Sequence, residues 1–183
     1  DLYRGDITVT DDDGNELPCQ IILERSTIPG FRTRVVFSGT VPPMGYAVYH
    51  FNQKGGDVRH SCDGDADVLD GGILTVKTMN ENGGVEIRDN RDGSVYAITP
   101  EVRADDGDVW SFNTCGFGDA LEPFTPISAA RTESGDIKNV VRTRFGFRSS
   151  KMEQRITVYP GRDYVDIAYR VDWDEPHTAL KYR

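Results

Sequence analysis

The chain has 183 residues and a formal net charge of −9, with 37% hydrophobic and 28% charged residues. This length is enough for one medium domain or two small ones, and the composition is ordinary for a soluble globular protein. An acidic chain is repelled by phosphate backbones, so we expect no nucleic-acid partner. No apolar run approaches 18 residues, so we expect no membrane span.

The N-terminus and the cysteines give indications of the cellular compartment of the protein. The chain begins with Asp1 and has neither the charged nor the apolar region of a signal peptide, so we expect a start set by processing or by a domain boundary. Cys19, Cys62 and Cys115 are widely spaced and form no CxxC motif. This pattern argues against a disulfide framework or zinc knuckle and favours reduced thiols in a cytoplasmic protein.

Short stretches along the chain alternate apolar and polar residues. The alternation runs over residues 31–37, 141–147 and 156–158, and each stretch predicts a strand with one buried and one solvated face. Clusters of Gly, Pro, Asn and Asp separate the stretches, at residues 11–15, 27–30, 80–84, 89–93 and 159–163. The pattern predicts an all-β chain, an antiparallel β-sandwich of about twelve strands.

Residues 52–72 differ in composition from the rest, because they are rich in Gly and Asp and hold few large apolar side chains. We expect a linker or long exposed loop over 54–72. It would separate part of a small β-sandwich over 1–53 from the front part of a large β-sandwich over 73–183. About four strands make a thin core, so we expect further strands of the small sandwich outside this chain.

Two patterns resemble metal sites. Asp63, Asp65 and Asp67 have the spacing of an EF-hand loop, but Val68 stands where the loop needs Gly and Leu74 where it needs Glu. A solvated acidic linker explains them better. The turn at 11–15 and the three scattered histidines, His50, His60 and His177, likewise predict no metal site in this chain.

One loop has the residues of a sugar-binding edge. Trp110 lies in DDGDVWSFN, residues 105–113, with Asp108 two residues earlier. A tryptophan can stack on a sugar ring while a carboxylate binds its hydroxyls, although a tryptophan in the sandwich core fits the same sequence. We identify Asp108 and Trp110 as candidates for the rim of a substrate site, and no residue here as catalytic.

The C-terminal segment YRVDWDEPHTALKYR combines carboxylates, a tryptophan and a histidine, as an active site would. Alternation from Val165 onward puts Trp173 on the buried face of a strand, with Asp172 and Asp174 outward. Pro176 ends the strand, and residues 178–182 begin another. The pattern therefore favours a strand, a turn and a strand over a catalytic cluster.

Three stretches in this order resemble glycoside hydrolase family 38, the α-mannosidases. They are DDDGNELPCQ with VPPMGYAVY at 41–49, then GGILTVKTMNENGGVEIRDNRDGS at 71–94, and the run from Met152 to Arg183. The last is the most specific. It carries the family pattern at Gln154, Ile156, Tyr159, Val171, Asp172, Trp173, Glu175, His177, Leu180 and Lys181.

The resemblance implies a fragment of the C-terminal β-sandwich region, with a large sandwich like that of galactose mutarotase. The family's zinc ligands and nucleophilic aspartate belong to an N-terminal catalytic domain, so they correspond to no residue here. The expected role is a non-catalytic part of a retaining α-mannosidase that braces the catalytic domain and contributes to the substrate rim. The fragment alone would need no cofactor and would be inactive.

Two alternatives stay open. The chain would act as a free-standing carbohydrate-binding module if exposed aromatic side chains stack on glycans. It would act as a structural interaction domain if no mannosidase accompanies it. The sequence leaves the oligomeric state undetermined, although strand edges exposed at the ends of a fragment can pair between chains.

Overall fold

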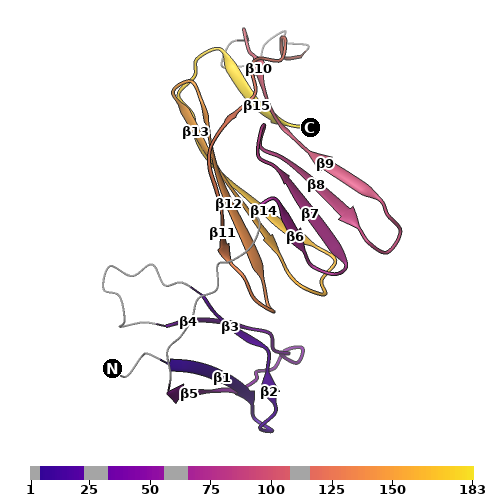
Figure 1. Ribbon diagram of the computed structural model, residues 1–183, viewed down its shortest axis with the longest axis vertical. Helices are drawn as coiled ribbons and strands as arrows, with labels where there is room; N and C mark the ends of the chain where they lie inside the picture. The colour runs from indigo at the N-terminus through magenta and orange to yellow at the C-terminus, as the bar shows by residue number, and fades with distance from the viewer. Residues whose placement is uncertain (1–4, 23–32, 56–65, 108–115) are drawn as a thin grey trace. The chain divides into compact units, whose positions relative to one another are not determined.

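The computed structural model describes residues 5–22, 33–55, 66–107 and 116–183 (Figure 1). In these ranges the chain forms fifteen β-strands and no helix. The described residues therefore include no helix that could cross a membrane. All the strand pairs with a defined register are antiparallel. The predicted all-β class is confirmed.

The chain divides into two compact units. Unit 1 comprises residues 1–63 and 133–139, and unit 2 comprises residues 64–132 and 140–183. The division between residues 63 and 64 falls inside the segment expected as a linker. The assignment of 1–53 to part of a small sandwich stays a prediction.

Unit 1 holds a three-stranded sheet, in the order β2-β1-β5, and a separate two-stranded pair. Val9, at the centre of the sheet, is fully buried. The side chain of Gln20 ties the pair to residues 133–139, because its Oε1 accepts hydrogen bonds from the amides of Ile137 and Lys138 at 3.2 and 3.0 Å. The strands are β1 (Gly5–Asp11), β2 (Glu16–Leu17), β3 (Cys19–Ile22), β4 (Arg34–Phe37) and β5 (Tyr49–Gly55).

Unit 2 contains two four-stranded sheets and a two-stranded pair. The sheets have the orders β6-β7-β8-β9 and β11-β12-β13-β14, and β10 pairs with β15. The first sheet comprises β6 (Val68–Asp70), β7 (Leu74–Met79), β8 (Gly84–Asp89) and β9 (Val95–Ile98). The others are β10 (Pro100–Ala104), β11 (Thr125–Glu133), β12 (Asn139–Phe147), β13 (Ser150–Val158), β14 (Val165–Asp172) and β15 (Thr178–Tyr182).

The core of unit 2 has two clusters of buried side chains. The first joins β6–β8 to β12 and β13, so the two large sheets pack face to face as a β-sandwich. Its buried members are Leu69, Val76, Val85, Val141, Ile156 and Val158. The second joins β10 to the other end of β12 and β13, through Val102, Phe124, Phe145, Phe147 and Met152.

The predicted alternation is present in β12 and β13. Val141, Thr143 and Phe145 are buried, whereas Arg142 and Arg144 between them are not. The turn clusters at 11–15, 80–84, 89–93 and 159–163 each connect two strands, as their residues predict. The cluster at 27–30 lies outside the described residues.

Strand β6 corrects part of the expected linker. Residues 68–70 pair with β7, and Leu69 is fully buried in the first core cluster. A three-residue segment with one buried apolar side chain gives no periodicity to detect, so its burial is decided by the tertiary contacts of the sandwich. At the other end of the expected linker, which starts at residue 54, strand β5 continues to Gly55.

Strand β9 is at the edge of its sheet. Just before it, the carbonyl of Ser94 accepts a hydrogen bond from the amide of Asp89 at 2.9 Å, on the side of β8. Just after it, Thr99 exchanges two backbone hydrogen bonds with Arg183, at 2.9 and 3.0 Å. Backbone N–H and C=O groups alternate in direction along a strand. The N–H and C=O groups of the odd-numbered residues of β9 therefore point away from β8, toward the edge of the sheet.

Candidate functional site

The candidate site combines the stem of the 105–113 loop with the carboxylate-rich segment 172–177. Asp108 and Trp110, the two residues expected at a substrate rim, lie outside the described residues. The structure describes the loop up to residue 107 and the chain again from residue 116, so the geometry of the stem can be stated.

The stem is closed by hydrogen bonds between its two sides. The amide of Gly118 donates to the carbonyl of Ala104 at 2.8 Å, and the amide of Ala104 donates to the carbonyl of Asp119 at 3.0 Å. The guanidinium Nε of Arg103 donates to the carbonyl of Gly118 at 3.0 Å. The loop therefore starts from a fixed base at the end of β10.

The stem also meets the C-terminal segment. The amide of Asp105 donates to the carbonyl of His177 at 2.9 Å, just before β15 begins. On the other side of the stem, the ammonium of Lys181 lies 3.7 Å from the centroid of the Phe117 ring, a cation–π distance. The structure thus brings together residues that lie 72 positions apart (Asp105 and His177) and 64 positions apart (Phe117 and Lys181) in the sequence.

Trp173 is half-buried and contacts the second core cluster. Its ring is stacked on Phe147, with centroids 6.0 Å apart and planes 3° from parallel, and lies 6.5 Å from the Phe124 ring. The prediction that Trp173 faces the core is confirmed. A ring that packs against two other aromatic rings is a packing element of the core.

Glu175 is the least accessible carboxylate of the segment, with 8% of its side chain exposed. Its Oε1 accepts a hydrogen bond from the amide of Ser149 at 2.7 Å, in the β12–β13 turn. Its Oε2 lies 3.8 Å from Nη1 of Arg148. Both carboxylate oxygens therefore bind the turn.

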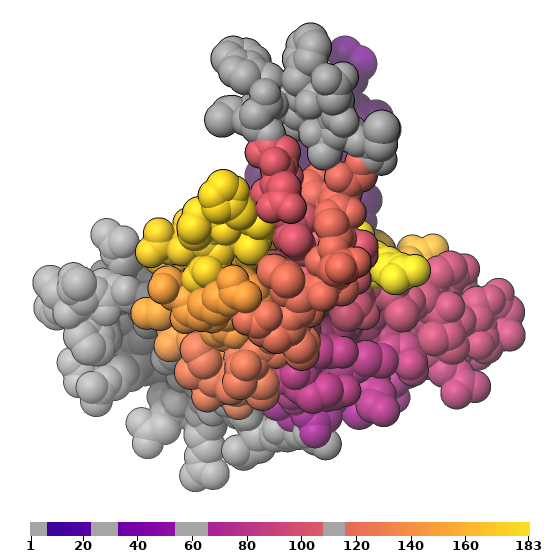
Figure 2. Space-filling model, turned by 90° about the horizontal axis from the view of Figure 1, so that it is seen from above, coloured from indigo at the N-terminus to yellow at the C-terminus, as the bar shows by residue number. Residues whose placement is uncertain are grey.

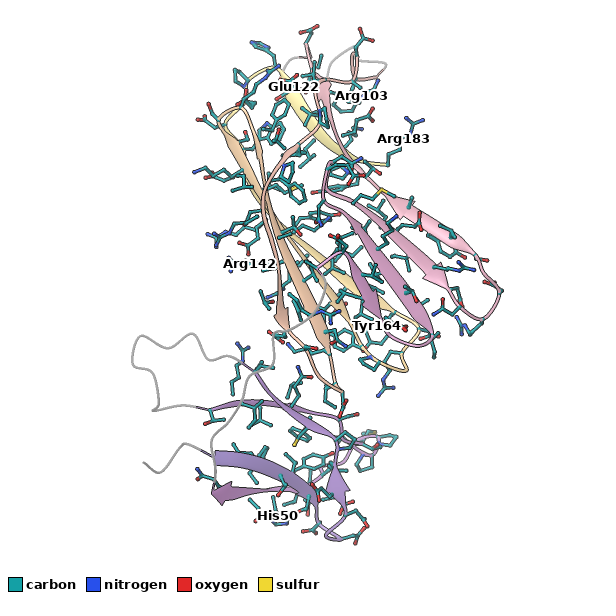
Figure 3. The ribbon with its side chains drawn as sticks, viewed as in Figure 1. His50, Arg103, Glu122, Arg142, Tyr164 and Arg183 are labelled. Carbon is teal, nitrogen blue, oxygen red and sulfur yellow. The ribbon has the colours of Figure 1, made fainter. Side chains whose placement is uncertain are left out.

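Arg148 occupies the left-handed region of the backbone, with φ at 49°, which is uncommon outside glycine. Its guanidinium binds Glu122 through two hydrogen bonds of 2.7 and 3.2 Å and lies 4.9 Å from the centroid of the Phe147 ring. The hydrogen bonds from Arg148 lower the pKa of the Glu122 carboxyl. Glu122 and Arg103 lie at the same end of unit 2 (Figure 3).

The remaining polar residues of the segment face solvent. Asp172, Asp174 and His177 are exposed, which agrees with the outward direction predicted for the two aspartates. The amide of Asp174 donates to the hydroxyl of Ser150 at 2.8 Å, so the segment is attached to β13. Figure 2 shows the C-terminal residues (yellow) beside the orange surface of β13. The predicted strand at residues 178–182 is β15.

Within the described ranges, no three His, Cys, Asp or Glu side chains converge as metal ligands would. The turn at 11–15 is organised by Asp11, whose Oδ1 accepts hydrogen bonds from the amides of Asp13 and Asn15 at 3.1 and 2.8 Å. His50 bonds to Asp12 at 3.2 Å. Of the EF-hand-like aspartates, Asp67 is described, and its carbonyl accepts from the amide of Thr78 at 2.8 Å.

Sequence reasoning did not identify the partners of Glu175. A Glu two residues after an inward-facing aromatic gives no signal for a contact with a turn 26 residues away. The contact depends on the pairing of β13 with β14, which puts the start of β13 beside the end of β14.

Comparison with known proteins gives one match. The family model described as "Glycosyl hydrolases family 38 C-terminal domain" matches residues 69–183. That range includes the whole candidate site and nearly all of unit 2. No curated protein and no solved structure matches the chain.

Proposed function

The chain belongs to the glycosyl hydrolases of family 38, and we propose that it is a non-catalytic β-sandwich portion of an α-mannosidase. In this proposal it braces a catalytic domain that lies outside the present sequence. The parent enzyme hydrolyses terminal α-mannosides with retention of configuration, and the chain alone turns over no substrate. We propose a cytoplasmic location for it.

One observation carries the non-catalytic role. In the segment that most resembles the family, the least accessible carboxylate and the tryptophan are both engaged in structural contacts. Both oxygens of Glu175 bind the β12–β13 turn, and Trp173 is stacked on Phe147. A general acid or base must reach the proton that it transfers, and a carboxylate with 8% of its side chain exposed is poorly placed to do so.

Zinc, which the family resemblance implies for the parent enzyme, does not fit the residues described here. A catalytic zinc site needs three protein ligands and an open position, and the described ranges offer no such group of side chains. We therefore assign zinc to the catalytic domain and derive no chemical step from it in this chain.

The same proposal gives the 105–113 loop a place at the substrate rim. The support is its stem, which is hydrogen-bonded at its base and linked to His177. A loop on a fixed base can hold a side chain near a neighbouring domain at small entropic cost. Asp108 and Trp110 would bind the hydroxyls and the apolar face of a mannose ring.

The test compares the chain with the full product of its gene, each assayed on a chromogenic α-mannoside with and without a chelator. We expect turnover by the full protein, loss of turnover with the chelator, and no turnover by the chain alone. In the full protein, replacing Asp108 and Trp110 by alanine should raise KM, whereas replacing the exposed Tyr46 by alanine should not. Chelator-sensitive turnover by the purified chain would overturn the proposal.

A titration with manno-oligosaccharides, followed by tryptophan fluorescence, tests the carbohydrate-binding alternative. The bracing role predicts no saturable change for the isolated chain. Saturable quenching at sub-millimolar ligand would instead identify a free-standing carbohydrate-binding module. A full gene product without a catalytic domain would identify a structural interaction domain.

A further inference from the structure

The outer face of sheet β11-β14 carries a groove of about 310 Å³. Figure 3 shows Arg142 on the side of this sheet away from β6–β9. Four cationic side chains and two carboxylates line the groove: Arg142, Arg144, Lys151 and Arg170, with Glu153 and Asp172. Positive charge thus exceeds negative charge on this face, in a chain whose net charge is −9.

The strand register accounts for this gathering of charge. Side chains at alternate positions share a face, and the residues that alternate with the buried Met152 and Gln154 point outward. Across the β13–β14 pair, Lys151 is opposite Asp172 and Glu153 is opposite Arg170.

Glu153 has three guanidinium groups as neighbours and forms ion pairs with two of them. It forms ion pairs with Arg142 and with Nε of Arg144, the latter at 3.3 Å, and it is the cross-strand neighbour of Arg170. Its hydrogen bond with Arg142 holds the pKa of the Glu153 carboxyl below the ordinary value. One carboxylate cannot neutralise three guanidinium groups, so the cluster retains capacity for further anions.

Donor groups in the groove also remain unused. The Nε of Arg142 is buried without an acceptor among the described residues. Within the described residues, neither Arg170 nor Lys151 has a hydrogen bond or ion pair through its side chain. Unused guanidinium and ammonium donors at a concave surface favour an anionic ligand.

We propose that this groove binds an acidic segment of a polypeptide, with carboxylates on Arg144 and Arg170. These arginines come from β12 and β14, which are separated by β13, so their strands are about 10 Å apart. Two carboxylates of an extended peptide can span this distance and so bind the two arginines separately. No exposed aromatic side chain lines the groove, so a neutral sugar would find no stacking surface there.

The proposal is independent of the proposed function and is tested on the full chain. The probe is a fluorescein-labelled, acetylated hexaglutamate amide, and the matched control probe is hexaglutamine. We expect saturable binding of hexaglutamate by anisotropy at low salt, weakening as salt rises. General charge attraction cannot produce this result, because the chain as a whole repels the probe.

Variants locate the site. Arg170→Gln should weaken hexaglutamate binding about tenfold, and Arg170→Lys should recover part of the loss. Arg88→Gln removes the same charge from the exposed surface of β8 and should leave binding unchanged. Circular dichroism spectra should be the same for all variants.

Three results would overturn the proposal. The first is no hexaglutamate binding at about 1 mM protein. The second is an equal loss for Arg88→Gln and Arg170→Gln. The third is sulfate binding that depends on Arg170 and is at least as tight as hexaglutamate binding. This result would assign the groove to a small anion.

Discussion

The side-chain amide of Gln154 on β13 donates a hydrogen bond of 2.8 Å to the carbonyl of Gly83, across the sandwich in the β7–β8 turn. Gln154 is 1% exposed, and its Nε2 also lies 3.2 Å from the hydroxyl of Tyr169. This bond connects the two sheets through polar groups that water does not reach. Gln154 is one of the residues on which the family resemblance rests, and its role here is structural.

Gln154→Met should lower the free energy of unfolding of unit 2 by about 1–3 kcal/mol, because the buried carbonyl of Gly83 loses its partner. The measurement is urea unfolding followed by Trp173 fluorescence in a Trp110→Phe background. Arg155→Gln, at the exposed neighbouring position, should change stability by less than about 0.5 kcal/mol. Equal effects of the two variants would contradict the assigned bond.

Trp173→Ala should destabilise unit 2 by about 3 kcal/mol, because it removes the ring stacked on Phe147 and leaves a void beside Phe124. Trp173→Phe keeps an aromatic ring and should cost less than half of this. The measurement is thermal unfolding by circular dichroism. A loss below about 0.5 kcal/mol for the alanine variant would show that the ring contributes no packing.

Proline substitutions at neighbouring positions of β9 should have opposite outcomes. The amide of Tyr96 faces β8, where Ile87 is its cross-strand partner, so Tyr96→Pro should cost about 2 kcal/mol or more. The amide of Ala97 faces the unpaired edge, so Ala97→Pro should cost less than about 1 kcal/mol. Urea midpoints compare the two variants, and a greater loss for Ala97→Pro would reverse the assigned direction of the strand.

Asp89 should give unit 2 a measurable acid sensitivity. Hydrogen bonds from Arg91 lower the pKa of Asp89 from 3.8 to about 2. A depressed carboxyl pKa stabilises the folded state above the unfolded pKa, and this stabilisation is lost as pH falls through the folded pKa. The stability difference between the wild type and Asp89→Asn should therefore be constant above about pH 5 and disappear between about pH 4 and 2.

A carboxyl titration by NMR separates this effect from general acid unfolding. Arg91→Gln removes the main cause of the shift, so the Asp89 pKa should move up toward 3.8. An Asp89 pKa that is the same in the wild type and in Arg91→Gln would rule out this ion pair as the cause.

Strands with long alternating patterns were predictable, because burial on one face leaves a period of two in the sequence. β12 and β13 illustrate this, and so does the inward direction of Trp173 at the end of the β14 pattern. Strand β6 was not predictable, since Leu69 is its one large buried side chain. Most of β11 is exposed, so its sequence carries no alternation, and its place is decided by pairing with β12.

The candidate site was predictable in its residue types and not in its contacts. The acids of segment 172–177 suggested chemistry, and alternation alone directed Asp172 and Asp174 outward. The hydrogen bond from the Ser149 amide to Glu175 depends on strand register between distant segments. A single sequence does not specify this register. The charged residues that line the groove around Glu153 come from three strands. Their gathering could not be predicted without the register of those strands.

The two core clusters of unit 2 share the same two strands. β12 supplies Val141 to the first cluster and Phe145 to the second, and β13 supplies Ile156 and Met152 in the same way. Disruption of β12 and β13 at one cluster therefore removes packing from the strands on which the other cluster also depends. Unit 2 should therefore unfold in one cooperative transition, with hydrogen exchange of the β12 and β13 amides governed by global unfolding.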